Sequence, residues 1–203
     1  MSTCYPINLF GKFTEYLRDE NYHFISNEEK GVIFFGIAMR GNLANIQYQI
    51  LVEENSFVSY AICPISGDVR NRKQMTELAS YLHFANHNLL PGNFEFDLKG
   101  GEIRFKYFVN CNGMVLTNEI IENSVQIPAA VFSRYSEGIL GIIFNHMDAA
   151  EAIALSKSKE CTFESENCGT DSYDDDSIPR VFLDFLKRLN GGNNDKNESD
   201  IIK

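Results

Sequence analysis

The sequence predicts an α+β protein, a two-layer sandwich in which helices pack on an antiparallel sheet. Two observations predict it. Segments with apolar residues at helical spacing are grouped apart from segments in which polar and apolar residues alternate, and one stretch has the pattern of a hairpin. The expected order of elements is α-β-β-β-α-β-β-α, followed by a C-terminal amphipathic helix. The 203 residues, 44% of them hydrophobic and 23% charged, suffice for one full domain and an appendage.

The first half of the chain begins with a helix over residues 8–20, capped by Asn8, in which apolar side chains recur at helical spacing. Three strands follow it. Residues 32–39, with the sequence VIFFGIAM, are apolar on both faces, which predicts a central strand or one covered on both sides. Residues 45–52 alternate between apolar and polar side chains, and residues 57–63 form a third strand after a polar turn.

A long helix is expected over residues 71–90, because a stripe of apolar residues runs along it until Pro91 and Gly92 end it. A hairpin follows over residues 93–109. A two-residue turn at Gly100 and Gly101, both with positive φ, would pair Phe96 with Phe105. One face of this hairpin is then apolar, and the other face consists of oppositely charged pairs. A shift of one residue would destroy both patterns.

Three helices are expected after the hairpin. Residues 117–126 form a short helix capped by Thr117 or Asn118, and Pro128 suits the first turn of a second helix that runs to about His146. Residues 149–156 form a last short helix.

The junction between the long helix and the hairpin has the sequence NHNLLPGNFEFD, residues 86–97. Its skeleton consists of Asn86, Asn88, Leu89, Gly92, Phe94 and Asp97. In this place and order of elements it resembles the YbjN family of bacterial proteins, and the resemblance covers roughly residues 8–156. It implies a fold like that of type III secretion chaperones, which often form dimers. Members of the family are described as regulators of sensory transduction without an established enzymatic activity, so the resemblance implies no catalytic residues.

The same motif has a direct physical interpretation. Asn86 lies on the apolar stripe of its helix, where an unpaired amide would cost about 1–3 kcal/mol. We therefore expect it to tie the end of the helix to the following turn. Gly92 supplies the backbone freedom with which the chain reverses into the next strand. In this interpretation Asn86, Asn88, Gly92, Phe94 and Asp97 determine the fold and do not bind a ligand.

Charge divides the chain into a body and a tail. Residues 160–203 contain eleven acidic and five basic side chains, so the tail carries −6 of the formal net charge of −10. We expect a domain over residues 1–156, an acidic linker over residues 157–177, an amphipathic helix over residues 178–190 and a disordered tail over residues 191–203. The acidic balance argues against a nucleic-acid partner.

Two sets of residues are candidates for binding a protein partner. Phe84 is expected on the side of the long helix opposite its apolar stripe, with Tyr81 beside it. The second set is the apolar face of the sequence IPRVFLDFLKRL in the tail, which comprises Ile178, Val181, Phe182, Phe185, Leu186 and Leu189. Twelve residues are too few for a stable isolated helix, so this segment must dock on its own domain, on a dimer mate or on another protein. A membrane surface is disfavoured because the segment is neither long nor strongly basic.

Motifs for catalysis, metals and cofactors are absent from the sequence. His83 and His87 have a spacing that can place two imidazoles on one metal ion, but the Glu of an HExxH motif is missing between them. The acidic run over residues 171–176 lacks the Gly and Glu of an EF-hand loop. The sequence therefore predicts no catalytic residue, no metal site, no cofactor and no enzymatic activity.

The five cysteines (Cys4, Cys63, Cys111, Cys161 and Cys168) are scattered, and the N-terminus lacks the pattern of a signal peptide. Both observations predict a cytoplasmic protein with reduced thiols, in contact with no membrane.

Three functional hypotheses remain. The first is a non-enzymatic, chaperone-like regulatory module that binds a protein partner or forms a homodimer. The second is a small-ligand-binding protein or an enzyme whose site is dispersed in the sequence. The third is a purely structural dimer.

Overall fold

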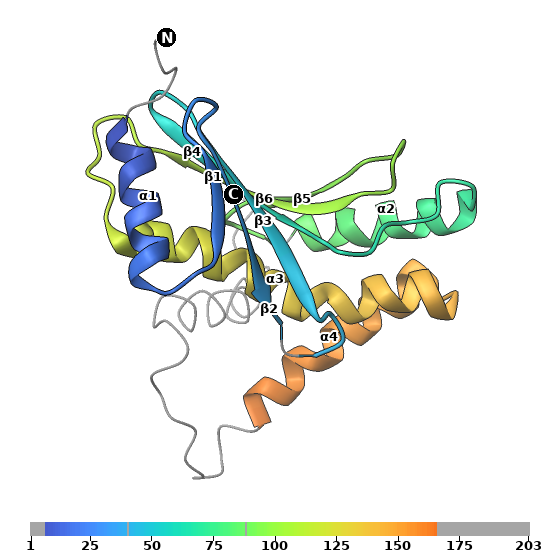
Figure 1. Ribbon diagram of the computed structural model, residues 1–203. Coiled ribbons are helices and arrows are strands. Elements are labelled where there is room, and N and C mark those ends of the chain that lie inside the picture. Colours follow the sequence, from blue (N-terminus) through green and yellow to red (C-terminus); the bar gives the residue numbers. More distant parts are fainter. Residues whose placement is uncertain (1–6, 40, 88, 166–203) are drawn as a thin grey trace, which may run out of the picture.

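The structure is a computed structural model that describes residues 7–39, 41–87 and 89–165 (Figure 1). Along the chain lie α1 (Ile7–Asp19), β1 (Phe24–Asn27), β2 (Val32–Ala38), β3 (Asn45–Val52), β4 (Ser56–Ile62), α2 (Arg72–His87), β5 (Asn93–Phe96), β6 (Ile103–Asn110), α3 (Asn118–Asn145) and α4 (Ala149–Ser165). The protein is an α+β fold, as the sequence predicts. The expected C-terminal helix over residues 178–190 and the tail after it lie outside the described residues.

The six strands form one open antiparallel sheet in the order β1-β2-β3-β4-β6-β5. Strand β1 is the element that sequence reasoning missed. It has four residues at the edge of the sheet, and three of them are exposed, so it shows little of the alternation that marks a half-buried strand.

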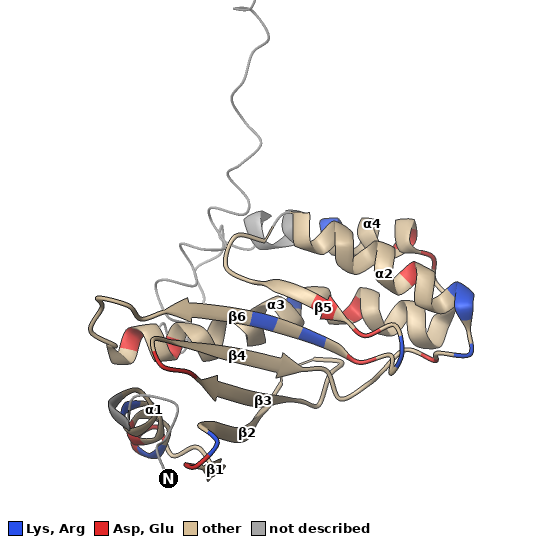
Figure 2. Cartoon of the chain, turned by 90° about the horizontal axis from the view of Figure 1, so that it is seen from above, with Lys and Arg blue, Asp and Glu red and all other residues tan. Residues whose placement is uncertain are grey.

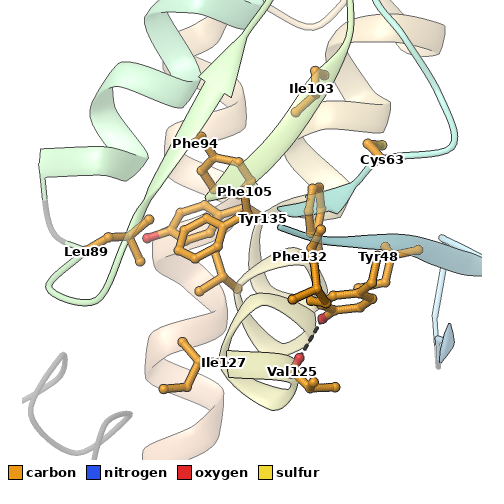
Figure 3. Packing of buried hydrophobic residues seen from close by; sticks show 14 of the residues in the cluster. Tyr48, Cys63, Leu89, Phe94, Ile103, Phe105, Val125, Ile127, Phe132 and Tyr135 are labelled. Carbon is orange, nitrogen blue, oxygen red and sulfur yellow. Dashed lines mark hydrogen bonds between the residues drawn. The ribbon is translucent and has the colours of Figure 1, made fainter. Parts of the chain in front are cut away.

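The helices α1, α2 and α3 cover one face of this sheet, here called the inner face. Helix α3 lies along it, behind strands β4 and β6 in the view of Figure 2. Helix α4 packs on α2 and α3 and so forms a partial third layer. Apolar side chains of the inner face and the helices make one continuous core (Figure 3). At its centre the ring of Phe94 contacts those of Phe105, Phe132 and Tyr135, with centroids 5.3–5.9 Å apart.

The hairpin of β5 and β6 has the predicted faces but a different register. Phe94, and not Phe96, lies opposite Phe105. The carboxylate of Asp97 accepts hydrogen bonds from the backbone N–H groups of Lys99 and Gly100, both at 2.9 Å, and so holds a four-residue loop over residues 98–101. Of the two glycines only Gly101 has a positive φ, +75°. The predicted two-residue turn is therefore wrong, and the register differs from the predicted one by two residues.

The two helices expected on either side of Pro128 are one helix, α3, and the predicted break is wrong. Pro128 lies inside α3 and cannot donate to the carbonyl one turn before it. The hydroxyl of Tyr48 on β3 enters the same turn. It donates to the carbonyl of Val125 at 2.5 Å (Figure 3), and it also interacts with the backbone N–H of Ala129. A side chain inserted into the helical ladder thus supplies polar contacts at the turn where the proline interrupts it.

The ends of the helices follow local capping rules. The hydroxyl of Thr117 accepts from the backbone N–H of Ile120 at the start of α3, as predicted, and His146 ends the helix in the left-handed conformation with φ of 55°. Helix α2 ends at His87, earlier than expected. Helix α4 runs past residue 156 to Ser165, into the segment expected to be the linker.

Candidate protein-binding face

The second face of the sheet, here called the outer face, is not covered by any of the described helices. The strand pairings place its side chains in rows that run across the sheet. The apolar row crosses four strands and consists of Val32, Leu51, Val58 and Phe108. The neighbouring row crosses all six strands and consists of Ile25, Phe34, Gln49, Tyr60, Lys106 and Asn93. These two rows make a partly apolar surface on the outer face of the sheet.

Three large apolar side chains of the outer face are strongly exposed. Ile25 is 76% exposed, Phe34 46% and Phe108 56%. Ile25 lies directly opposite Phe34 in the pairing of β1 and β2, so their side chains are neighbours on the same face. A group of exposed large apolar side chains on one face is typical of an interaction site.

The apolar sequence of β2 bears on this face directly. The prediction that residues 32–39 are covered on both sides is wrong for the described residues. Ile33 and Phe35 are buried on the inner face, whereas Phe34 on the outer face is not. Strand β2 is also the second strand of the sheet and not a central one. Its composition is typical of a strand that is covered on both faces, but among the described residues only its inner face is covered.

The far end of the outer face is polar and well paired. Arg104 forms an ion pair with Glu95 at 2.7 Å, and Lys106 with the same carboxylate at 3.4 Å. The guanidinium of Arg104 also lies 4.3 Å from the ring centroid of Tyr60. Figure 2 shows these two basic positions on β6 beside an acidic one on β5. The charged groups of the outer face therefore gather on β5 and β6, and along β6 the side chains change from the apolar Phe108 to the basic Lys106 and Arg104.

The structure places the two aromatic candidates on α2 differently from the prediction. Tyr81 is 0% exposed, and its hydroxyl lies 3.1 Å from the carbonyl of Tyr135 and 2.6 Å from the hydroxyl of Ser156. Burial raises the pKa of this hydroxyl. Phe84 is half-buried, and the ammonium of Lys157 lies 5.2 Å from its ring centroid. The expectation that Tyr81 is exposed is wrong because α4 covers this side of α2.

The other predicted binding residues belong to the tail. Ile178, Val181, Phe182, Phe185, Leu186 and Leu189 lie outside the described residues, as do the acidic positions 171–176.

The motif residues have the structural role that the sequence predicts, as far as they are described. The side-chain amide of Asn86 donates to the carbonyl of Phe94 at 3.0 Å and accepts from its N–H at 2.6 Å. Gly92 has a φ of +99°, and a side chain there would collide with the carbonyl of Lys106 and the ring of Phe105. Asp97 holds the hairpin loop. Asn88 lies outside the described residues.

The titratable groups of the described residues form no evident chemical centre. No three His, Cys, Asp or Glu side chains there gather as a metal site would require, and His83 and His87 are both exposed. Burial raises the pKa of the thiols of Cys63 and Cys111, which disfavours the reactive thiolate form. Burial also raises the pKa of Tyr48 well above its usual range. These groups serve the core.

In the described part of the chain, α3 is long and apolar enough to span a membrane by length and composition alone. In its most apolar stretch 56% is buried within the protein, and core helices of soluble proteins have the same properties.

Sequence reasoning missed the three exposed residues Ile25, Phe34 and Phe108. For Phe34 a signal exists in the sequence, because a strand that is apolar on both faces within an antiparallel sheet needs cover on both. For Ile25 the strand itself was missed.

Comparison with known proteins gives no family assignment. No family model matches the chain, and no curated protein matches it. The resemblance to the YbjN family remains an interpretation of the motif at residues 86–97.

Proposed function

We propose that the protein is a non-enzymatic binding module that takes up a segment of another polypeptide on the outer face of its sheet. The observation that carries the proposal is the apolar row, which ends at the exposed Phe108, together with the exposed Ile25 and Phe34 of the neighbouring row. Interfaces of this kind have an apolar centre and a polar rim. Here the apolar row and Phe34 supply the apolar part of the face, and the paired charges of Glu95, Arg104 and Lys106 supply one rim.

The face also fits a regulatory role better than a catalytic one. The charges of Glu95, Arg104 and Lys106 are paired with one another, and the other side chains of the two rows are aliphatic, aromatic, phenolic or amide groups. Such a surface can recognise a partner by shape and by burial of apolar area. The resemblance to YbjN proteins and to secretion chaperones implies the same class of function. The hypothesis of a dispersed ligand-binding or catalytic site has no specific observation in its favour.

The test places a photo-crosslinking amino acid, p-benzoylphenylalanine, at Phe34 in the full chain. Phe144 at the end of α3 is the matched control, because it is also a phenylalanine and is 62% exposed on the helical side of the protein. We expect one polypeptide to be captured reproducibly from Phe34 and not from Phe144. The purified partner should then bind Phe34→Asp/Phe108→Asp at least tenfold more weakly than the wild type, and Phe144→Asp unchanged. Equal capture from both positions, or unchanged affinity of the double variant, would contradict the proposal.

A further inference from the structure

We infer that the apolar row of the outer face is the docking site of residues 178–189 of the same chain. The inference rests on the proposed function, since it concerns the same face, and it adds a mode of regulation. A partner would have to displace the chain's own tail before it could bind.

The first argument comes from the face. Strand β2 is apolar on both faces, yet among the described residues only its inner face is covered. Leu51 and Val58 continue the apolar row on β3 and β4, and Phe108 completes it on β6. In the row itself Phe108 is exposed, Val32 and Leu51 are half-buried and Val58 is buried, and the exposed Phe34 and Ile25 lie in the neighbouring row. An occupant within the same molecule that covers the exposed and half-buried apolar side chains would stabilise the protein.

The second argument comes from the segment. Residues 178–189 have six apolar side chains at the spacing of a single helical face, whereas Asp184, Lys187 and Arg188 fall away from it. A segment of twelve residues does not form a stable helix in isolation. Its helical form therefore depends on an apolar surface of matching length.

The third argument is that the two lengths match. Four adjacent strands span three interstrand spacings, which places the ends of the apolar row about 14 Å apart. A helix from Ile178 to Leu189 is about 17 Å long at 1.5 Å per residue. One such helix laid across the strands would cover the row from Val32 to Phe108 and leave the charged end of the face free.

The fourth argument is the tether. Helix α4 ends at Ser165 on the helical side of the sheet, and residues 166–177 span up to about 40 Å when extended. This tether has to pass around an edge of the sheet to reach the outer face, across layers that lie about 10 Å apart. A short tether gives a local concentration in the millimolar range. A second copy of the chain or another protein would have to overcome the full entropic cost of association, about 4–15 kcal/mol, to occupy the same row. The chain's own tail does not bear that cost.

The test uses the full chain with p-benzoylphenylalanine at Phe108 and, as a control, at Phe144. Equal amounts of unlabelled and ¹⁵N-labelled protein are mixed before irradiation and digested with trypsin. We expect the peptide that begins at Tyr107 to be crosslinked to the peptide 181–187, with both peptides carrying the same isotope. The control at Phe144 should give at least tenfold less of this product.

A second variant separates docking from mere proximity. Phe182→Asp/Phe185→Asp in the full chain should reduce the crosslink from Phe108 at least tenfold, whereas Asp184→Ser on the opposite side of the segment should leave it unchanged. Crosslinked pairs of mixed isotope would assign the row to a second copy and overturn the inference. A crosslink to any other part of the chain, or an undiminished one in the double variant, would overturn it as well.

The two proposals can fail separately. If the crosslink to peptide 181–187 is missing but one partner is still captured at Phe34, the tail is not the occupant and the proposed function stands. If the tail is crosslinked and no partner competes with it even in Phe182→Asp/Phe185→Asp, the proposed function fails and the docking site stands.

Discussion

Replacement of Asn86 by alanine tests the central structural role of the motif. The side chain of Asn86 makes two hydrogen bonds to one residue of the edge strand β5, to the carbonyl of Phe94 at 3.0 Å and from its N–H at 2.6 Å. It therefore occupies the position that a neighbouring strand would otherwise take. Alanine removes both bonds and leaves the half-buried N–H of Phe94 without this acceptor.

The expected loss can be worked out bond by bond. The carbonyl of Phe94 keeps a second donor, the side-chain amide of Asn93 at 3.2 Å, so the loss of the bond from Asn86 to this carbonyl costs little free energy. The N–H of Phe94 loses its partner, at a cost of about 1–3 kcal/mol for a buried donor. We expect Asn86→Ala to lower the free energy of unfolding by about 2 kcal/mol. Asn93→Ala, an exposed residue on the same strand, should cost less than about 0.5 kcal/mol.

Urea unfolding followed by far-ultraviolet circular dichroism measures these differences, since the chain has no tryptophan. The double variant Asn86→Ala/Asn93→Ala should lose more than the sum of the single variants, because the carbonyl of Phe94 then loses both donors. The reasoning would be refuted by an Asn86→Ala variant as stable as the wild type, or by strictly additive losses.

Three further predictions follow from the packing of the core. Gly138→Ala should lower the free energy of unfolding by about 1–3 kcal/mol, because the new methyl group would collide with the hydroxyl and ring of Tyr81. Gly36→Ala is the control and should change the free energy of unfolding little, because its new methyl group would meet its nearest neighbour at an ordinary 3.7 Å. Equal effects of the two substitutions in urea unfolding would contradict this prediction. Tyr48 has a pKa raised by burial, so its hydroxyl ionises in the unfolded chain first, and its contribution to stability should be constant below about pH 10 and fall as the pH rises further. Thermal unfolding between pH 8 and pH 11 should show a shallower fall for Tyr48→Phe than for the wild type, and identical slopes would contradict this. The buried hydroxyl of Ser59 has no hydrogen-bond partner among the described residues, so Ser59→Ala should leave the free energy of unfolding unchanged or raise it by up to about 1 kcal/mol. A clear loss of stability in urea unfolding would show that the hydroxyl is bonded.

Local patterns in the sequence determine much of this protein. The apolar stripe of α2, the alternation of β3 and the cap of α3 at Thr117 each depend on residues within one element, and each is found as predicted. The role of Asn86 is also local, because a buried amide near the end of a helix must bond to the chain that follows. The hairpin shows where this reasoning ends. A shift of two residues leaves every side chain on the same face, so alternation selects the faces, but only the bonds of Asp97 select the register.

Contacts between distant segments decide the rest. Pro128 indicates locally the start of a helix, yet α3 continues through it, and the hydroxyl of Tyr48, from a strand far away in the sequence, bonds to the carbonyl of Val125 in the same turn. Tyr81 lies off the predicted apolar stripe of α2, and only the packing of α3 and α4 against it makes that side of α2 part of the core. The exposure of Phe34 also depends on tertiary packing. The sequence of β2 shows that both of its faces are apolar, but it does not show which face the helices cover. The candidate binding face is therefore a property of the tertiary structure, because it is the side of the sheet on which none of the described helices packs.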